Sequence, residues 1–480
     1  MRYSPGRRGG VGITGRRRSP TPADRREWRN WAGTAAAVPA RWCQPRNETE
    51  ISAVVKDAAA ARLQVRALGS GHSFTPIAAT DGQALDLSSW TGIVAADTRT
   101  GMVTVRSGTT LRELNSALGV LGLALANLGD IDAQTLAGAL STGTHGTGAR
   151  LGGLATQVEA LDLVLADGSL VSCSATTRPE LFAAARVGLG ALGVITTVTL
   201  RCVPSFTLAA DERPVPIDEV IEQFDSLADA NDHFEFYWFP YGRNALVKRN
   251  NRLAPSGAAP AGARPAPAAG TGLPPPPDDP GVMPEWRRFW EFEVMENAGF
   301  GTLCRIGRAV PRLVPTLNRF SSAVLSTRSY TDTGHRVFVT PRRVRFVESE
   351  YAVPRESVTG VLAELRRAVP RLADPVMFPV EVRVAAADDI WLSTAYGRDT
   401  GYIAIHQYAG LPYRAYFEAF ESIVAGVAGR PHWGKLHSLD AERLRPLYPR
   451  FDDFRRVRAE VDPESRFGNP YLSRILGQNA

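Results

Sequence analysis

Apolar residues recur with helical spacing soon after residue 40. Asn47, a residue type that caps helices, is followed by Ile51, Val54, Val55 and Ala58 at intervals of one to four. This pattern predicts a helix that begins after Asn47. A second helix is predicted over 111–121, and strands over 65–68, 84–87, 102–106, 161–166, 170–173 and 194–203. Residues 31–205 are therefore predicted to form one α+β domain.

The dipeptide Asp167-Gly168 stands between two of these predicted strands. Asp-Gly is favoured in tight two-residue turns, because both positions accept a positive φ at little cost. We therefore expect strands 161–166 and 170–173 to pair as an antiparallel hairpin.

The pattern changes near residue 206. Aromatic and β-branched runs predict strands over 234–241, 345–353, 377–384 and 402–408, with helices over 358–368 and 413–425. Residues 206–440 are expected to form a second domain built on one large antiparallel sheet. Its Ala/Pro/Gly-rich stretch 254–282 is expected to be a mobile loop, and 441–480 are expected to pack back on the first domain.

Charge is distributed unevenly along the chain. The protein has 480 residues, enough for two domains, and a net charge of +6. Residues 1–30 hold nine arginines and two acidic residues, which leaves about −1 for the rest. They are poor in apolar side chains, so we expect a disordered basic tail. Positive charge confined to a tail argues against a nucleic-acid-binding protein and leaves a peripheral contact with anionic lipid open.

The remaining composition indicates a cytoplasmic protein. The sequence contains no apolar run long enough for a transmembrane span. No apolar segment follows Arg16–Arg18, so we expect no signal peptide. The four cysteines are far apart and form neither a metal motif nor a disulfide framework.

Glycines cluster around a histidine directly after the predicted strand 65–68. In Gly69-Ser70-Gly71-His72-Ser73, glycines let backbone N–H groups approach a diphosphate closely. The spacing is not that of the dinucleotide fingerprint that opens a helix. A Gly-rich turn around a structural histidine explains this pentapeptide equally well.

A second cluster of small residues strengthens the cofactor interpretation. Residues 129–139 are rich in small side chains and lead into Thr142-Gly143-Thr144-His145-Gly146-Thr147-Gly148. Such a run suits a backbone that lies against a flat ring and a diphosphate. A surface loop would explain the glycines but not two Gly–His clusters in one domain.

Polar residues interrupt three apolar segments of the second domain. Glu381 and Arg383 alternate with valines, so both lie on one strand face. An inward face would point a carboxylate and a guanidinium into one cavity, whereas the alternative is an exposed, salt-bridged face. His406 and Tyr408 repeat this arrangement in 403–408, and a Trp-Gly turn presents Lys435.

The histidines do not predict a metal site. A zinc site at His432 and His437 would need further ligands, and the nearby acidic residues and cysteines do not cluster. On the same reasoning, His145, His233 and His335 are expected to be structural rather than catalytic.

The glycine motifs carry a family resemblance. Residues 69–74, 141–148, 167–169 and 189–195 together resemble the vanillyl-alcohol-oxidase-type flavoproteins with a PCMH-type FAD-binding domain. Within that fold, residues 30–475 are similar to the aldonolactone oxidoreductases. The resemblance implies a two-domain α+β flavoprotein whose substrate domain is a large antiparallel sheet. It implies covalent attachment of FAD to His72, and flavin contacts from Gly69, Ser70, Gly71, Ser73, Gly129, Asp130, Thr135, Gly138, Thr142, Gly143, Thr144, His145, Val194 and Ile195.

The same resemblance assigns roles on the substrate side. Oxidation of a CH–OH group requires a proton acceptor, for which Glu381 is the candidate, acting directly or through His406. Arg383 and Lys435 would offset developing negative charge, and the implied substrate contacts are Asp130, Glu381, Arg383, Tyr408 and Lys435. The implied substrates are L-gulono-, D-arabinono- or L-galactono-1,4-lactone, as in ascorbate-like biosynthesis.

Two alternatives stay open. An alditol oxidase of the same fold would share these residues, although Asp130 stands where such enzymes have serine. A flavin- or sugar-binding module without turnover would be expected to have lost one of the reactive side chains. Gly129 aligns with a position that admits O2 to the flavin, which favours an oxidase, whereas similar bacterial enzymes use cytochrome c-like acceptors and family members are often membrane-associated.

Overall fold

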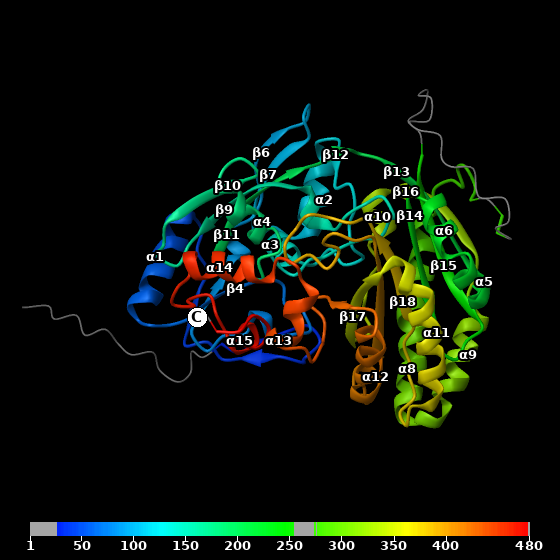
Figure 1. The fold of residues 1–480 in the computed structure, drawn as a ribbon. Helices are drawn as coiled ribbons and strands as arrows, with labels where there is room; N and C mark the ends of the chain where they lie inside the picture. Colours follow the sequence, from blue (N-terminus) through cyan, green and yellow to red (C-terminus); the bar gives the residue numbers. More distant parts are fainter. Residues whose placement is uncertain (1–25, 254–272, 275, 479–480) are drawn as a thin grey trace, which may run out of the picture.

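The computed structural model describes residues 26–253, 273–274 and 276–478. Most of the basic tail predicted over 1–30, and most of the loop predicted over 254–282, lie outside these residues. Figure 1 shows the first domain, coloured from blue to teal, at the left together with the red C-terminal helices, beside a large sheet and its helices at the right.

A small parallel sheet begins the first domain. β3 (Arg41–Cys43) and β4 (Val65–Leu68) both pair with β5 (Gln83–Asp86). Between β3 and β4 runs α1 (Glu48–Ala60), where the Asn47 side chain accepts a hydrogen bond from the Glu50 backbone N–H. Ile51, Val55 and Ala58 of this helix are buried, which confirms the predicted helix and its apolar face.

A five-stranded antiparallel sheet completes the domain, in the order β10-β9-β11-β7-β6. Its strands are β6 (Ile93–Asp97), β7 (Met102–Arg106), β9 (Val158–Val164), β10 (Leu170–Ser174) and β11 (Val194–Arg201). The helices beside it are α2 (Leu111–Val120), α3 (Leu136–Ser141) and α4 (Pro179–Ala185). Short strand pairs join β1 (Trp28–Arg29) to β2 (Ala36–Ala37) and β8 (Leu123–Ala124) to β12 (Val203–Pro204).

The predicted hairpin is present, but the prediction of a two-residue turn is wrong. β9 and β10 pair antiparallel, and the Leu165 N–H donates to the Ser169 carbonyl at 2.9 Å. Three residues lie between this pair, and the last of them, Gly168, has φ +78°. The Asp167 carboxylate accepts the Ser169 N–H at 2.8 Å, so its side chain holds a longer turn that ends in a left-handed glycine.

The second domain is built on an eight-stranded antiparallel sheet in the order β16-β13-β15-β14-β18-β19-β17-β20. Its strands are β13 (Thr207–Pro216), β14 (His233–Trp238), β15 (Asn244–Arg252), β16 (Arg328–Thr333), β17 (Phe346–Pro354), β18 (Val380–Ala385), β19 (Thr400–Tyr408) and β20 (Arg430–Pro431). The predicted large antiparallel sheet is confirmed. β13, β15 and β16 were not predicted.

The two faces of this sheet differ in chemistry. Val380, Val382 and Val384 are fully buried on the face covered by α5 (Ile217–Glu222), α6 (Phe224–Ala230), α11 (Val358–Ala368) and α12 (Arg414–Ala425). Glu381 and Arg383 alternate with these valines and take the opposite face, where Arg383 lies 3.7 Å from Asp130 of the first domain. The polar face of the sheet is therefore turned toward the first domain.

A further group of helices was not predicted. It comprises α7 (Glu285–Arg288), the π-helix η5 (Phe289–Gly299), α8 (Phe300–Ala309) and α9 (Val314–Ala323), followed after β16 by α10 (Gly334–Phe338). α8 and α9 contact each other and extend to the lower right in Figure 1.

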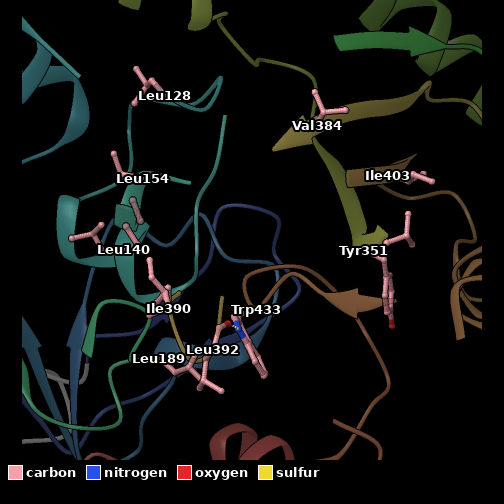
Figure 2. Packing of buried hydrophobic residues seen from close by; sticks show 14 of the residues in the cluster. Leu128, Leu140, Leu154, Leu189, Tyr351, Val384, Ile390, Leu392, Ile403 and Trp433 are labelled. Atoms are coloured by element: carbon pink, nitrogen blue, oxygen red, sulfur yellow. Dashed lines mark hydrogen bonds between the residues drawn. The ribbon is translucent and has the colours of Figure 1, made fainter. Parts of the chain in front are cut away.

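The C-terminal segment contains α13 (Ala441–Leu444), α14 (Phe451–Val461) and α15 (Pro470–Leu476). Arg456 of α14 pairs with Glu180 of α4 at 2.9 Å, and the Asn469 side chain donates to the Ile77 carbonyl at 3.0 Å. One apolar cluster runs across both domains. Figure 2 shows Leu189, Leu392 and Trp433, from distant parts of the sequence, within it.

Candidate active site

The glycine motif after β4 lines a narrow cavity in the first domain. Gly69, Ser70, Gly71, His72 and Ser73 form one wall. The facing walls come from the start of α3 and from the loop before β11, through Gln134, Thr135, Gly138, Ser141, Thr142, Leu189, Gly190, Gly193 and Ile195. The two glycine-rich motifs of this domain therefore meet at one site.

The backbone of the 69–73 loop is oriented by the segment just after β1. The Gly71 carbonyl accepts the Trp31 N–H at 2.8 Å, and the Ser73 carbonyl accepts the Asn30 amide at 2.9 Å. Among the described residues, the N–H groups of Ser70, Gly71, His72 and Ser73 have no hydrogen-bond partner. Consecutive free N–H groups form an anion nest, which fits the diphosphate of FAD.

Glycine at position 69 is required by a close approach. A Cβ there would lie 2.7 Å from the Thr135 hydroxyl, which itself caps α3 by accepting the Gly138 N–H. On the opposite wall, Leu189 and Gly190 both have positive φ, at +57° and +62°. The buried Arg66 guanidinium donates to both of their carbonyls, and these hydrogen bonds hold the strained turn.

His72 projects into this cavity without a polar partner. Its ring stacks on Trp31 with centroids 6.0 Å apart, and neither ring nitrogen has a hydrogen-bond partner among the described residues. Burial and the positive charge of Lys435 hold the pKa of His72 below its usual value. The imidazole is therefore neutral and nucleophilic near pH 7.

The His72 loop touches the Trp-Gly turn of the second domain. The Phe74 N–H donates to the Gly434 carbonyl at 2.7 Å, and the Lys435 ammonium lies 5.3 Å from the centre of the Phe74 ring. The structure thus joins two motifs that are more than 350 residues apart in sequence, and Lys435 stands between the glycine cradle and a second cavity.

This second cavity, of about 480 Å³, lies over the polar face of the large sheet. Its inner end is lined by Asp130, Tyr237, Glu348, Glu381, Arg383, His406 and Lys435. The expectation that Glu381 and Arg383 share one cavity is met, and the exposed-face alternative fails because both are buried.

Glu381 is held by two neighbours. The Tyr237 hydroxyl donates to its carboxylate at 2.9 Å, and Arg383 forms an ion pair with it. Burial raises the pKa of Glu381 above its usual value; Arg383 opposes this, and the negative charges of Asp130 and Glu235 reinforce it. Of the carboxyls at this end, Asp130 and Glu348 instead have lowered pKa values, so Glu381 is the strongest base.

Lys435 and His406 share the carboxylate of Glu348. The Lys435 ammonium lies 2.6 Å from one oxygen, and His406 Nε2 lies 3.5 Å from the other and 3.9 Å from Glu381. Burial alone would lower the pKa of Lys435, but the carboxylates of Glu348 and Glu350 raise it. Glu348 similarly raises the pKa of His406 against the effect of burial. Lys435 is therefore a fixed positive charge.

Asp130 joins the loop of the first domain to this cluster. Its carboxylate lies 2.7 Å from Arg342 and 3.7 Å from Arg383. Burial would raise the pKa of Asp130, but the two guanidinium groups hold it far below its usual value. Asp130 is thus a permanently ionised acceptor at the boundary between the two domains.

Several predicted residues lie elsewhere. Val194 packs in an apolar core, and Gly143, Thr144 and Gly129 line neither cavity in the described part of the chain. A Cβ at Gly129 would lie 3.0 Å from the His145 carbonyl, so glycine here permits a close backbone approach. The predicted O2 gate stays a prediction. Tyr408 is half-buried against Phe378, outside the cavity lining.

His145 lies in a buried cluster between the domains. Its ring stacks on Tyr402 at 3.5 Å, and Nε2 lies 3.1 Å from the Glu350 carboxylate. His145, Glu350 and His432 each offer one potential metal-ligand atom, and these three atoms lie within 4.8 Å of one another. His437, the partner considered from the sequence, instead contacts Tyr471. The expectation of no metal stays a prediction.

Sequence reasoning missed residues whose partners are distant in sequence. Tyr237, Glu348 and Arg342 carry no motif, and they are recognised only because Glu381, Lys435 and Asp130 lie beside them. Gly190 and Gly193, by contrast, fall inside the 189–195 motif, and the glycines themselves were a usable signal.

Comparisons with known proteins agree with this geometry. The family model of D-arabinono-1,4-lactone oxidase matches residues 198–475, and that of an FAD binding domain matches 39–174. L-Gulono-1,4-lactone dehydrogenase of Mycobacterium tuberculosis is 42% identical over 450 residues, covering 94% of this chain and 99% of that protein. L-Gulonolactone oxidase of Bos taurus is 34% identical over 464 residues, covering 94% and 98%.

Solved structures support the fold alone. A solvent-stable cholesterol oxidase superposes with a TM-score of 0.75 at 19% identity, covering 95% of this chain and 98% of that one. The fold therefore matches an FAD-binding, two-domain architecture. Since the lactone oxidase model covers more than half of the chain and close relatives span nearly all of it, the chain belongs to the D-arabinono-1,4-lactone oxidase family of FAD-dependent oxidoreductases.

Proposed function

We propose that this protein oxidises an aldono-1,4-lactone, such as L-gulono-, D-arabinono- or L-galactono-1,4-lactone, with FAD as cofactor. The observation that carries the proposal is the cavity that brings Glu381, Arg383, His406 and Lys435 together beside the glycine cradle. Relatives named as lactone oxidases and dehydrogenases, over nearly the full length, favour a lactone over an open-chain polyol.

FAD fits the residues present. The free N–H groups of 70–73 and the Thr135–Thr142 wall would hold its diphosphate, and its ring would lie toward Lys435 and the second cavity. When bound, FAD supplies a two-electron acceptor for the substrate carbon. Side chains of the protein accept the substrate proton and stabilise the charge that develops.

Glu381 is proposed to take the proton of the substrate hydroxyl. Its raised pKa makes it a better proton acceptor than an ordinary carboxylate, and the Tyr237 hydroxyl fixes its orientation. Lys435 and Arg383 stabilise the negative charge that develops on the substrate oxygen as the proton leaves. His406 lies within 3.9 Å of Glu381 and provides a route by which the proton moves on.

Steady-state turnover tests the proposal. With a dye as electron acceptor, we expect turnover with aldono-1,4-lactones and at least ten-fold lower kcat/KM with xylitol. Preference for xylitol would make the protein an alditol oxidase of the same fold. Binding of lactone without turnover would make it a binding module.

We also propose that His72 carries the FAD covalently. The partner-free, neutral imidazole in the cradle supports this. On a denaturing gel under acid, flavin fluorescence should migrate with the wild-type chain and be lost in His72→Ala. Release of free FAD from the wild type would remove the tether and leave the fold and the reaction untouched.

Three finer points are part of the proposal. The acceptor is O2 or a cytochrome c-like protein, the protein acts in the cytoplasm, and it associates peripherally with membranes. Within the described residues, no helix is both long and apolar enough to cross a membrane. Exposed apolar and arginine side chains on α8 and α9 support peripheral association, which sedimentation with anionic and zwitterionic vesicles would test.

A further inference from the structure

The large cavity has two ends of different chemistry. The inner end carries the charged residues described above, beside the glycine cradle. The outer end is formed mainly by η5, α8, α9 and the segment after α9, where apolar side chains lie beside charged ones such as Glu296 and Arg328. Its side chains include Met295, Phe300, Leu303, Phe320, Val324 and Leu325.

The outer end opens on the molecular surface. Met295, Phe320 and Val324 line the cavity and are also 50%, 53% and 50% exposed. Side chains that line the cavity and are also exposed to solvent lie at its opening. The route from solvent to the charged inner end thus passes an apolar entrance.

The surface around this mouth is also rich in apolar side chains and arginines. Trp286, Phe289 and Trp290 are more than half exposed beside it on α7 and η5. Four exposed arginines, at 305, 308, 312 and 319, lie on or between α8 and α9, and none pairs with a carboxylate of the described chain. The sequence has no acidic residue between 297 and 331. Aromatic and arginine side chains together favour an anionic lipid surface.

A lactone accounts for only the inner end. A polyhydroxylated ring needs hydrogen-bond partners, which are dense at the inner end and sparse along the apolar side chains of the outer wall. The reaction has a second substrate, the electron acceptor, which must approach the same cofactor. A passage with apolar side chains that leads to the donors Lys435 and Arg383 matches a molecule with an apolar tail and a polar, electron-accepting head.

We propose that the outer half of the cavity binds the tail of a lipid-soluble quinone, which acts as a further electron acceptor beside O2 or a cytochrome c-like protein. The quinone head would replace the oxidised product at the inner end, where Lys435 and Arg383 can donate to its two carbonyl oxygens. The lactone CH–OH loses two electrons and two protons, and the quinone gains both and leaves as the quinol. The electrons pass through the bound FAD, so this inference rests on the proposed function.

Equilibrium binding tests the site without relying on turnover. Each methylene buried from water favours binding by about four-fold. By isothermal titration calorimetry on the flavin-loaded protein, decyl-ubiquinone should therefore bind at least ten-fold more tightly than ubiquinone-0, which has the same head and no tail. Equal affinities would overturn the proposal.

Matched variants localise the tail. Phe320→Gln, at the mouth, should reduce the affinity ratio of tailed to tail-less quinone at least five-fold. Phe289→Gln changes the same residue type in a neighbouring exposed position outside the cavity lining, and should keep the wild-type ratio. A ratio that both variants change equally, or that neither changes, contradicts the assigned site. Flavin content and thermal midpoint establish that each variant is folded.

Kinetics separate this inference from the proposed function. Lactone-dependent reduction of ferricyanide, a small hydrophilic acceptor, reports the oxidation alone. Loss of that activity would contradict the lactone reaction. Ferricyanide reduction with no preference of kcat/KM for the tailed quinone would contradict only the quinone site.

Discussion

At the scale of single residues, the site depends on charges buried in pairs. Glu348 and Arg383 are buried and Asp130 is half-buried, and each is opposed by a partner of opposite charge. Burying an unpaired charge is costly, so these pairs keep their ionisation states constant over a wide pH range. Glu381 differs, since burial and two neighbouring carboxylates raise its pKa despite Arg383. It is the group whose protonation state should control the rate.

Glu381→Gln tests this assignment. Loss of a general base typically lowers kcat by about 10²–10⁴-fold, and we expect a fall in that range with a smaller change in KM. The wild-type kcat/KM should rise with pH through an acidic limb above the usual range of a glutamate, because the base must be deprotonated. The variant should lack this limb. Activity within ten-fold of wild type, with the limb retained, would place the base elsewhere.

At the scale of elements, the shape of the glycine cradle after β4 depends on glycines, because their lack of a side chain lets a neighbouring backbone or side chain come close. Gly69→Ala would place a Cβ 2.7 Å from the Thr135 hydroxyl and displace either the loop or the α3 cap. We expect FAD content, measured from the flavin-to-protein absorbance ratio, to fall several-fold. Gly119→Ala in α2 is the matched control, since a Cβ there meets nothing within 4 Å. It should retain full FAD and gain about 0.5 kcal/mol of stability.

The elements also show what hydrophobic patterning reveals and what it misses. The predicted bounds of β4, β7 and α11 agree with the structure, because their apolar residues face a core. β13 was missed because its sequence contains two prolines and three charged residues. Asp211 and Glu212 are buried there only by pairing with Arg249 and Arg328. Those partners lie dozens of residues away, so no local pattern predicts the burial.

The residues of the candidate site also fall into two groups, those with a local sequence signal and those that only the fold brings together. Glycine motifs and a Glu–x–Arg alternation are local, so the cradle and the polar strand could be predicted. Arg342 and Tyr237 act through contacts to Asp130 and Glu381 that only the fold creates.

At the scale of the whole molecule, neutral histidines link segments that are distant in sequence. His233 Nδ1 lies 2.8 Å from the Thr147 carbonyl and so links β14 to the first domain. His437 contacts Tyr471 of α15. Burial lowers the pKa of His233 to about 4 and that of His437 to about 3. Both are therefore uncharged in the folded protein near neutral pH.

These shifts predict loss of stability in acid. Below the unfolded pKa of about 6.5 the unfolded state binds more protons, so the free energy of unfolding should fall as pH decreases toward about 4. Each such histidine contributes roughly 2 kcal/mol by pH 5, partly offset by His406, whose pKa is raised. Urea unfolding at pH 7 and pH 5 measures the difference, and His437→Gln should reduce it. Equal stability at both pH values would contradict the account.

We propose that this protein brings an aldonolactone and FAD together at the cavity between its two domains. The most direct measurement is anaerobic titration of the purified, flavin-loaded protein with L-gulono-1,4-lactone, followed by visible flavin absorbance. We predict that the flavin band bleaches with lactone, persists with xylitol, and bleaches far more slowly in Glu381→Gln. A flavin band unaffected by any aldono-1,4-lactone would contradict the account.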